Sequence, residues 1–253
     1  MLAASLLGAP AALPAADVEL FPDAQVRLSA ARYAPAETDL HWTGWIGAGG
    51  DLVRVDGVTG WGIAEVETIL GDTLRPFEAN QANYHLQLGV RRAVSRVDVE
   101  PFFHHVSRHY VDRPKTQAVD WNLLGVRGAT HFRPGGRPLR VEAGVGKTFQ
   151  ASLPGYQWEW TAAAQIAARE GDGASPYGRL SLRYVTIRDR AEPRTLQRGN
   201  FLDRWVEVGL RLARGGRAID LFLAVERRHD VFLEVPGART RALFGVSFQA
   251  RTR

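Results

Sequence analysis

The stretch PFFHHVSRHYVDR, residues 101–113, brings together the residue types of a serine hydrolase site. Alternate side chains of a β-strand share a face, so His105, Ser107 and His109 would lie on one side, about 7 Å between neighbours. A serine hydroxyl becomes a nucleophile when an imidazole takes its proton and a third group orients that imidazole. The spacing predicts Ser107 as nucleophile and His105 as base, with His109 an equally placed alternative.

A following segment, AVDWNLLGVRGA, supplies groups that could orient the base. In an antiparallel sheet it would descend beside residues 101–113. Its Arg127 assigns the Trp121 face to a polar interior, so Asp120 and Asn122 would face the same way as the serine. The predicted catalytic set, including one loop aspartate, is Ser107, His105, His109, Asn122, Asp120 and Asp112.

Two other interpretations of this cluster stay open. Polar residues at the rim of a sheet often hydrogen-bond loop backbone or lipid headgroups, which would make the cluster structural. Metal binding by His105 and His109, with Asp112, is the other. Histidines four apart on a strand lie about 13 Å apart, too far to share one ion without a bulge. No metal and no cofactor are therefore predicted.

In the segments that must position these residues, apolar and polar residues alternate with the period of two that is typical of β-strands. No stretch keeps the 3.6-residue period of a helix. Most alternating segments run 10 to 14 residues. That length exceeds the usual strand of soluble proteins and matches tilted strands that cross a bilayer. The first two segments are the least regular, and the second may be broken at GAGG. The twelve segments lie near residues 24–33, 39–55, 59–69, 82–93, 95–109, 119–132, 137–148, 156–169, 176–188, 201–214, 217–228 and 239–252.

Short connections such as DGVTG and ARGGRA alternate with longer ones. Short periplasmic turns and long outer loops are typical of outer-membrane barrels. A soluble sandwich would show similar alternation with shorter strands. We therefore predict an all-β, antiparallel transmembrane barrel of about twelve strands in the bacterial outer membrane. An aromatic girdle toward the long-loop end would comprise Trp42, Trp45, Trp121, Trp158, Trp160 and Trp205.

The terminus MLAASLLGAPAALPAA resembles the back half of a secretory signal. We predict a truncated signal peptide over residues 1–16 and the barrel over 17–253; the alternative is a frayed apolar terminus. Cysteine is absent, which excludes disulfides and thiolate metal sites. The net charge is +5, but the arginines are scattered singly, so no nucleic-acid partner is predicted.

Many charged residues fall on the inward face of the predicted strands. They could pair and fill the lumen or line an anion-preferring channel, and we favour pairing. The basic ones are Arg91, Arg96, Arg127, Arg140, Arg179, Arg183, Arg211 and Arg241. The acidic ones are Glu65, Glu67, Asp98, Glu100, Glu142, Glu159, Glu207, Asp220 and Glu226.

The pair His105-x-Ser107 on an outward face resembles the catalytic element of outer-membrane phospholipase A, a twelve-stranded barrel with a His-Ser-Asn site, and that of the smaller lipid A 3-O-deacylases. Both families usually follow the serine with Asn, where this chain has Arg108. The resemblance implies hydrolysis of lipid acyl esters, with membrane lipid and lipopolysaccharide as partners. The alternative is a non-enzymatic structural barrel or narrow pore.

A longer resemblance, of about 60 residues from DLVRVDG to HVSRHYVD, is to an uncharacterised bacterial barrel family whose hallmark is His-x-Ser-Ser-His-x-x-Asp. Arg108 replaces the second serine of that hallmark, and its other positions are His105, Ser107, His109 and Asp112. This resemblance implies an outer-membrane barrel and carries no established reaction.

Overall fold

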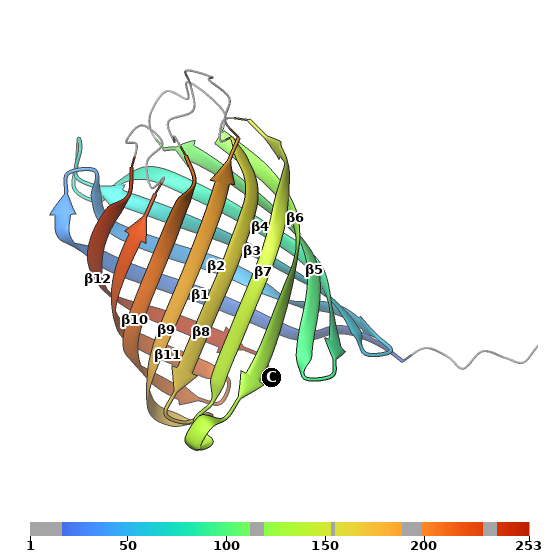
Figure 1. The fold of residues 1–253 in the computed structure, drawn as a ribbon. Helices are drawn as coiled ribbons and strands as arrows, with labels where there is room; N and C mark the ends of the chain where they lie inside the picture. Colours follow the sequence, from blue (N-terminus) through green and yellow to red (C-terminus); the bar gives the residue numbers. More distant parts are fainter. Residues whose placement is uncertain (1–16, 112–118, 153–154, 189–198, 230–236, 253) are drawn as a thin grey trace, which may run out of the picture.

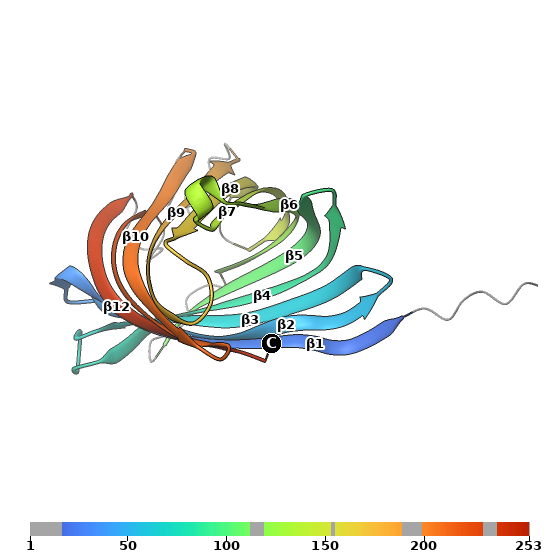
Figure 2. The same cartoon turned by 90° about the horizontal axis from the view of Figure 1, so that it is seen from below.

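A computed structural model describes residues 17–111, 119–152, 155–188, 199–229 and 237–252. Within these ranges twelve antiparallel strands form one closed barrel in which each strand pairs with its neighbours in sequence and β1 pairs with β12 (Figures 1 and 2). The strands are β1 (Val18–Glu37), β2 (Leu40–Val55), β3 (Val58–Gly71), β4 (Glu78–Val94), β5 (Val97–Tyr110), β6 (Val119–Phe132), β7 (Leu139–Ala151), β8 (Tyr156–Ala167), β9 (Gly173–Ile187), β10 (Phe201–Arg214), β11 (Arg217–Arg228) and β12 (Arg239–Arg251).

The predicted fold class is confirmed, and each of the twelve predicted segments is a strand. β1 is longer than expected, and β2 runs through GAGG without a break, although its register with β3 shifts between Asp51 and Val53. The predicted signal segment lies outside the described residues and stays a prediction.

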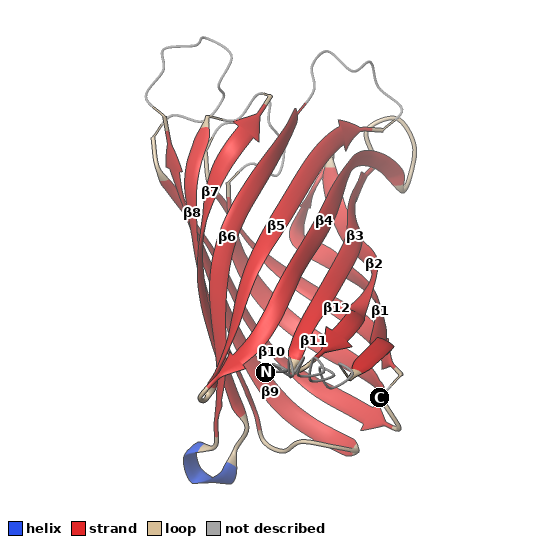
Figure 3. Cartoon of the chain, turned by 90° about the vertical axis from the view of Figure 1, so that its right-hand side faces the viewer, coloured by secondary structure: helices blue, strands red, loops and turns tan. Residues whose placement is uncertain are grey.

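The two ends of the barrel differ, as the alternating connections predict. One end carries tight turns, the short 3-10 helix η1 (Pro134–Gly136) and the C-terminus (Figure 3). The turn between β10 and β11 is Gly215–Gly216, and both glycines have positive φ, 54° and 76°. Such a two-residue turn needs that conformation at both positions. By the usual arrangement of outer-membrane barrels, this is the periplasmic end.

The outer wall is apolar and open to the surroundings. On β10 and β11 the outward side chains form cross-strand rows whose members are between 39 and 63% exposed. Apolar surface of this extent is typical of a face that meets lipid. No helix among the described residues is long and apolar enough to cross a bilayer. The outward residues of the three central rows are Val206, Val208, Leu210, Leu221, Leu223 and Val225.

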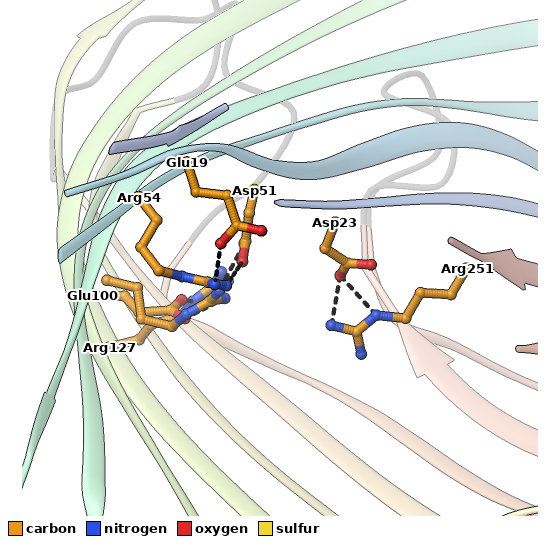
Figure 4. Close-up of polar contacts among 8 residues, drawn as sticks. Glu19, Asp23, Asp51, Arg54, Glu100, Arg127 and Arg251 are labelled. Carbon is orange, nitrogen blue, oxygen red and sulfur yellow. Dashed lines mark hydrogen bonds and ion pairs between the residues drawn. The ribbon is translucent and has the colours of Figure 1, made fainter. Parts of the chain in front are cut away.

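The interior holds the paired charges that the sequence predicts. Arg127 Nε donates to Glu100 Oε2 at 2.5 Å, and Arg91 Nη2 donates to Asp51 Oδ1 at 2.6 Å. Figure 4 shows part of this network near the periplasmic end, where Arg251 also bonds to an aspartate of β1. These pairs form inside the lumen because each buried charge needs an opposite partner.

The predicted aromatic girdle is only partly right. Trp158 and Trp160 are 42% and 51% exposed on the outer wall. Trp45, Trp121 and Trp205 instead line an interior cavity. Their positions along the strands indicate height in the barrel, whereas the face they occupy follows the alternation of each strand. The girdle prediction is therefore wrong for these three tryptophans, although the inward direction of Trp121 agrees with its assignment from Arg127.

Candidate functional site

Strands β5 and β6 carry the predicted site residues to the outer wall. In their register Ser107 lies opposite Asp120, and His105 lies opposite Asn122. Directly opposed residues of an antiparallel pair share a face. Leu124, on the same face of β6, is 56% exposed among the lipid-facing residues. These four polar side chains therefore share the outward face.

The cluster lies close to the extracellular end of the two strands. β5 ends at Tyr110 and β6 begins at Val119, so Ser107 is about 10 Å from the end of its strand. The same face below it is apolar, with Leu124 and Val126 exposed on the outer wall. The cluster thus sits where the apolar band gives way to the rim.

Ser107 contacts His109, the alternative base. The distance from Ser107 Oγ to His109 Nε2 is 2.7 Å. The ring of Tyr84, from β4, packs edge-on against the imidazole with centroids 5.4 Å apart. This packing limits rotation of the imidazole and keeps Nε2 near the hydroxyl. The structure pairs the serine with His109 rather than with His105.

His105 forms a separate chain of hydrogen bonds across three strands. Its Nδ1 lies 2.7 Å from Asn122 Oδ1, and Asn122 Nδ2 donates to Gln150 Oε1 of β7 at 2.5 Å. An amide oxygen can only accept, so the proton of the neutral His105 ring lies on Nδ1 and the lone pair on Nε2. His105 is therefore held in the tautomer that a general base needs.

Gln150 is a site residue that the sequence reasoning missed. It meets Asn122 because β6 and β7 are paired with a register shift between Asn122 and Leu123. A strict count of alternating residues does not reveal where such a bulge falls. No sequence signal marks this contact.

Of the two predicted aspartates, the structure describes Asp120, whose recorded hydrogen bonds go to Ser152. Ser152 Oγ hydrogen-bonds to Asp120 Oδ1, and the Ser152 amide donates to the Asp120 carbonyl oxygen at 3.0 Å. Asp120 is thus tied to the end of the β6–β7 pair. Asp112 lies outside the described residues. Within the described ranges, no group of three or more His, Cys, Asp or Glu side chains is placed to hold a metal ion.

The lumen contains two cavities, of about 870 Å³ near the periplasmic end and about 460 Å³ toward the extracellular end. Arg27, Glu65 and Arg179 line both, so the cavities adjoin at this level. Arg228 of β11 reaches across the barrel to Glu67 of β3 with two hydrogen bonds, of 2.5 and 2.7 Å. Charged side chains therefore cross the interior instead of leaving it clear.

No protein-family model matches the sequence, and no curated protein is similar to it. Solved structures do resemble the fold. Outer-membrane phospholipase A from Escherichia coli has a TM-score of 0.54 at 13% identity, covering 91% of this chain and 97% of that one. LpxR from Salmonella typhimurium has 0.52 at 10%, covering 88% and 99%. A Salmonella typhi outer-membrane phospholipase dimer with bound calcium has 0.53 at 13%, covering 89% and 90%.

At such low identity these likenesses show the fold, which is that of bacterial outer-membrane β-barrels. The fold agrees with the exposed apolar wall and with the closed twelve-stranded sheet. Together they place the chain in the bacterial outer membrane.

Proposed function

We propose that this barrel hydrolyses acyl esters of membrane lipids at the extracellular rim of its outer wall, with Ser107 as the nucleophile. The observation that carries the proposal is the 2.7 Å contact between Ser107 Oγ and His109 Nε2 on the outward face. A serine and an imidazole in hydrogen-bond contact are the first two parts of a nucleophilic site. Their position at the edge of the apolar band brings them level with lipid ester groups.

The chemistry follows from these two groups. Oγ attacks the ester carbonyl carbon while its proton passes to the imidazole. The tetrahedral intermediate collapses, the bond to the lipid alcohol breaks, and the imidazolium returns the proton to that alcohol. Water then attacks the acyl-serine with the imidazole again as base, which releases the fatty acid and restores Ser107.

The contact favours His109 as the base, and His105 is the second candidate. Asn122 holds His105 in the correct tautomer, but Ser107 would have to turn its hydroxyl away from His109 to use it. A variant of the Escherichia coli phospholipase described as an active-site mutant has an asparagine replaced by alanine. That likeness supports a role for Asn122 through His105.

The decisive experiment measures fatty-acid release from labelled phospholipid and from lipid A by refolded protein in mixed micelles. We expect release by the parent protein and its loss in Ser107→Ala. Ser181→Ala is the matched control, because Ser181 is a strand serine that lines the interior cavity. Activity that survives Ser107→Ala, or no release from either lipid by a folded protein, would contradict the proposal.

A narrow pore is the alternative function, favoured by the arginine-lined cavity of about 870 Å³ at the periplasmic end. The two hydrogen bonds between Arg228 and Glu67 argue against a pore, because this pair of side chains spans the lumen. Planar-bilayer recording separates the two. We expect no steady conductance from the parent protein, and a stable open current would favour the pore.

A further inference from the structure

Two arginines face each other at the periplasmic end of β10 and β11. Arg214 lies directly opposite Arg217 across the Gly215–Gly216 turn. Both belong to the alternating set that points outward with Leu212, and both are exposed. Like charges directly opposed on a sheet are destabilising unless an anion lies between them. Neither guanidinium has a hydrogen bond or ion pair to any residue in the described ranges.

The arginines stand at the end of an apolar groove on the outer wall. The groove has a volume of about 650 Å³. Its apolar side chains come from the adjacent row of the sheet, in which Leu212 pairs with Ile219 and Ile219 pairs with Phe248. The shape is therefore a hydrophobic trough with two cationic groups at one end.

The position of this groove along the membrane normal matches that of phospholipid headgroups. A second opposed pair, Arg204 and Arg227, lies on the same outward face near the extracellular end. Ten residues of β10 separate Arg204 from Arg214, which is about 34 Å along the strand. With the usual barrel tilt of about 35–45°, this corresponds to about 24–28 Å along the membrane normal, the height of the apolar band. The arginine pairs thus mark its two boundaries.

Two carboxylates of the β8–β9 connection, Asp172 and Glu170, have other hydrogen-bond partners. Asp172 Oδ1 accepts the amide hydrogen of Gly215 at 3.0 Å, and Asp172 borders the interior cavity, whose lining also includes Arg217. Glu170 lines the same cavity and bonds to Arg133. An anion from outside the protein would therefore supply the partner that the two exposed guanidinium groups lack among the recorded hydrogen bonds and ion pairs.

We propose that the groove binds a glycerophospholipid of the periplasmic leaflet. Its phosphate bridges Arg214 and Arg217, which suit planar, charge-assisted bonds to phosphate oxygens. Its acyl chains lie along Leu212, Ile219 and Phe248. This site is on the opposite end of the barrel from the Ser107 cluster and is independent of the proposed hydrolysis.

The test uses native mass spectrometry of the full chain in detergent micelles, titrated with phosphatidylglycerol. Diacylglycerol with the same chains serves as a probe that lacks phosphate. We expect one retained phosphatidylglycerol, and an apparent affinity about 30-fold weaker in the double variant Arg214→Gln/Arg217→Gln, because each basic residue at a membrane surface contributes to lipid binding. Heat-modified gel migration verifies that each variant is folded.

The matched control is Arg204→Gln/Arg227→Gln, which removes the same charge from the same two strands at the other boundary. It should keep the parent affinity. An equal loss in this control, or no loss in the periplasmic variant, would overturn the proposal. Displacement of the lipid by millimolar inorganic phosphate would also overturn it, because the site would then select a free anion.

Discussion

Two imidazoles of β5, those of His105 and His109, are candidates for the general base, and their recorded contacts differ. His109 touches the Ser107 hydroxyl, whereas His105 is bonded to an amide that sets its tautomer. A general base needs both contact with the nucleophile and an orienting group. For His109, the ring of Tyr84 packs edge-on against the imidazole. The roles are therefore separable by substitution.

At this scale we predict that His109→Ala lowers kcat for ester hydrolysis by about 10²–10⁴-fold, the usual contribution of a general base. His105→Ala and Asn122→Ala should have smaller effects. The measurement is the rate of release from a micellar ester substrate, with His131→Ala, in the periplasmic cavity, as control. The reverse ranking would make His105 the base and leave His109 as a resting partner of the serine.

Neighbouring strands pack closely where an aromatic ring covers a glycine directly opposite it. Trp61 lies opposite Gly89, Tyr177 opposite Gly209 and Phe222 opposite Gly245. A Cβ at each of these glycines would come within 2.7 Å of the ring. The ring shields backbone that the glycine leaves uncovered, which helps to fix the register of the pair.

We predict that Gly209→Ala lowers the free energy of unfolding by about 1–3 kcal/mol, because the new methyl group would overlap Tyr177 and the Leu221 carbonyl. Gly178→Ala, one strand away, is the control, since its Cβ would meet neighbours only at 3.8 Å or more. It should change stability by less than about 0.5 kcal/mol. Urea unfolding in lipid vesicles, followed by tryptophan fluorescence, measures both; equal effects would contradict the packing argument.

The whole barrel is braced by contacts that cross its interior. The Arg228–Glu67 pair joins β11 to β3, and Asn83 Nδ2 of β4 donates to the same carboxylate at 2.7 Å. Glu67 is 1% exposed, so its charge depends on these partners. The Arg228–Glu67 pair also narrows the extracellular half of the lumen, where both residues line the cavity.

At this scale we predict that Glu67→Ala lowers the free energy of unfolding by about 3–5 kcal/mol, because it leaves the Arg228 guanidinium unpaired. The double variant Glu67→Met/Arg228→Met should lose less, since neither charge remains. Arg133→Gln, which breaks an exposed pair with Glu170, should cost at most about 1 kcal/mol. A cost for Glu67→Ala no larger than that of Arg133→Gln would show that the brace contributes little.

The sequence alone predicts the number and length of the strands and the outward direction of Ser107, His105 and Asn122. It can do so because the alternation of side chains with a period of two is a local property of each strand. Neighbouring strands of a meander also pair in sequence order, so the sequence predicts that Asn122 lies beside the two histidines, whereas its match with His105 depends on the register. The same alternation determines which tryptophans face lipid. The girdle prediction used only the position of each tryptophan along its strand, and was therefore partly wrong.

Specific contacts between side chains, and the closure of the sheet into a barrel, become visible only in the folded structure. Ser107 meets His109 through the orientation of side chains, and Asn122 meets Gln150 through a register shift. Glu67 and Arg228 are 161 residues apart in sequence and meet because the sheet closes on itself. Such contacts depend on bulges, strand stagger and the curvature of the whole sheet, which no single segment encodes.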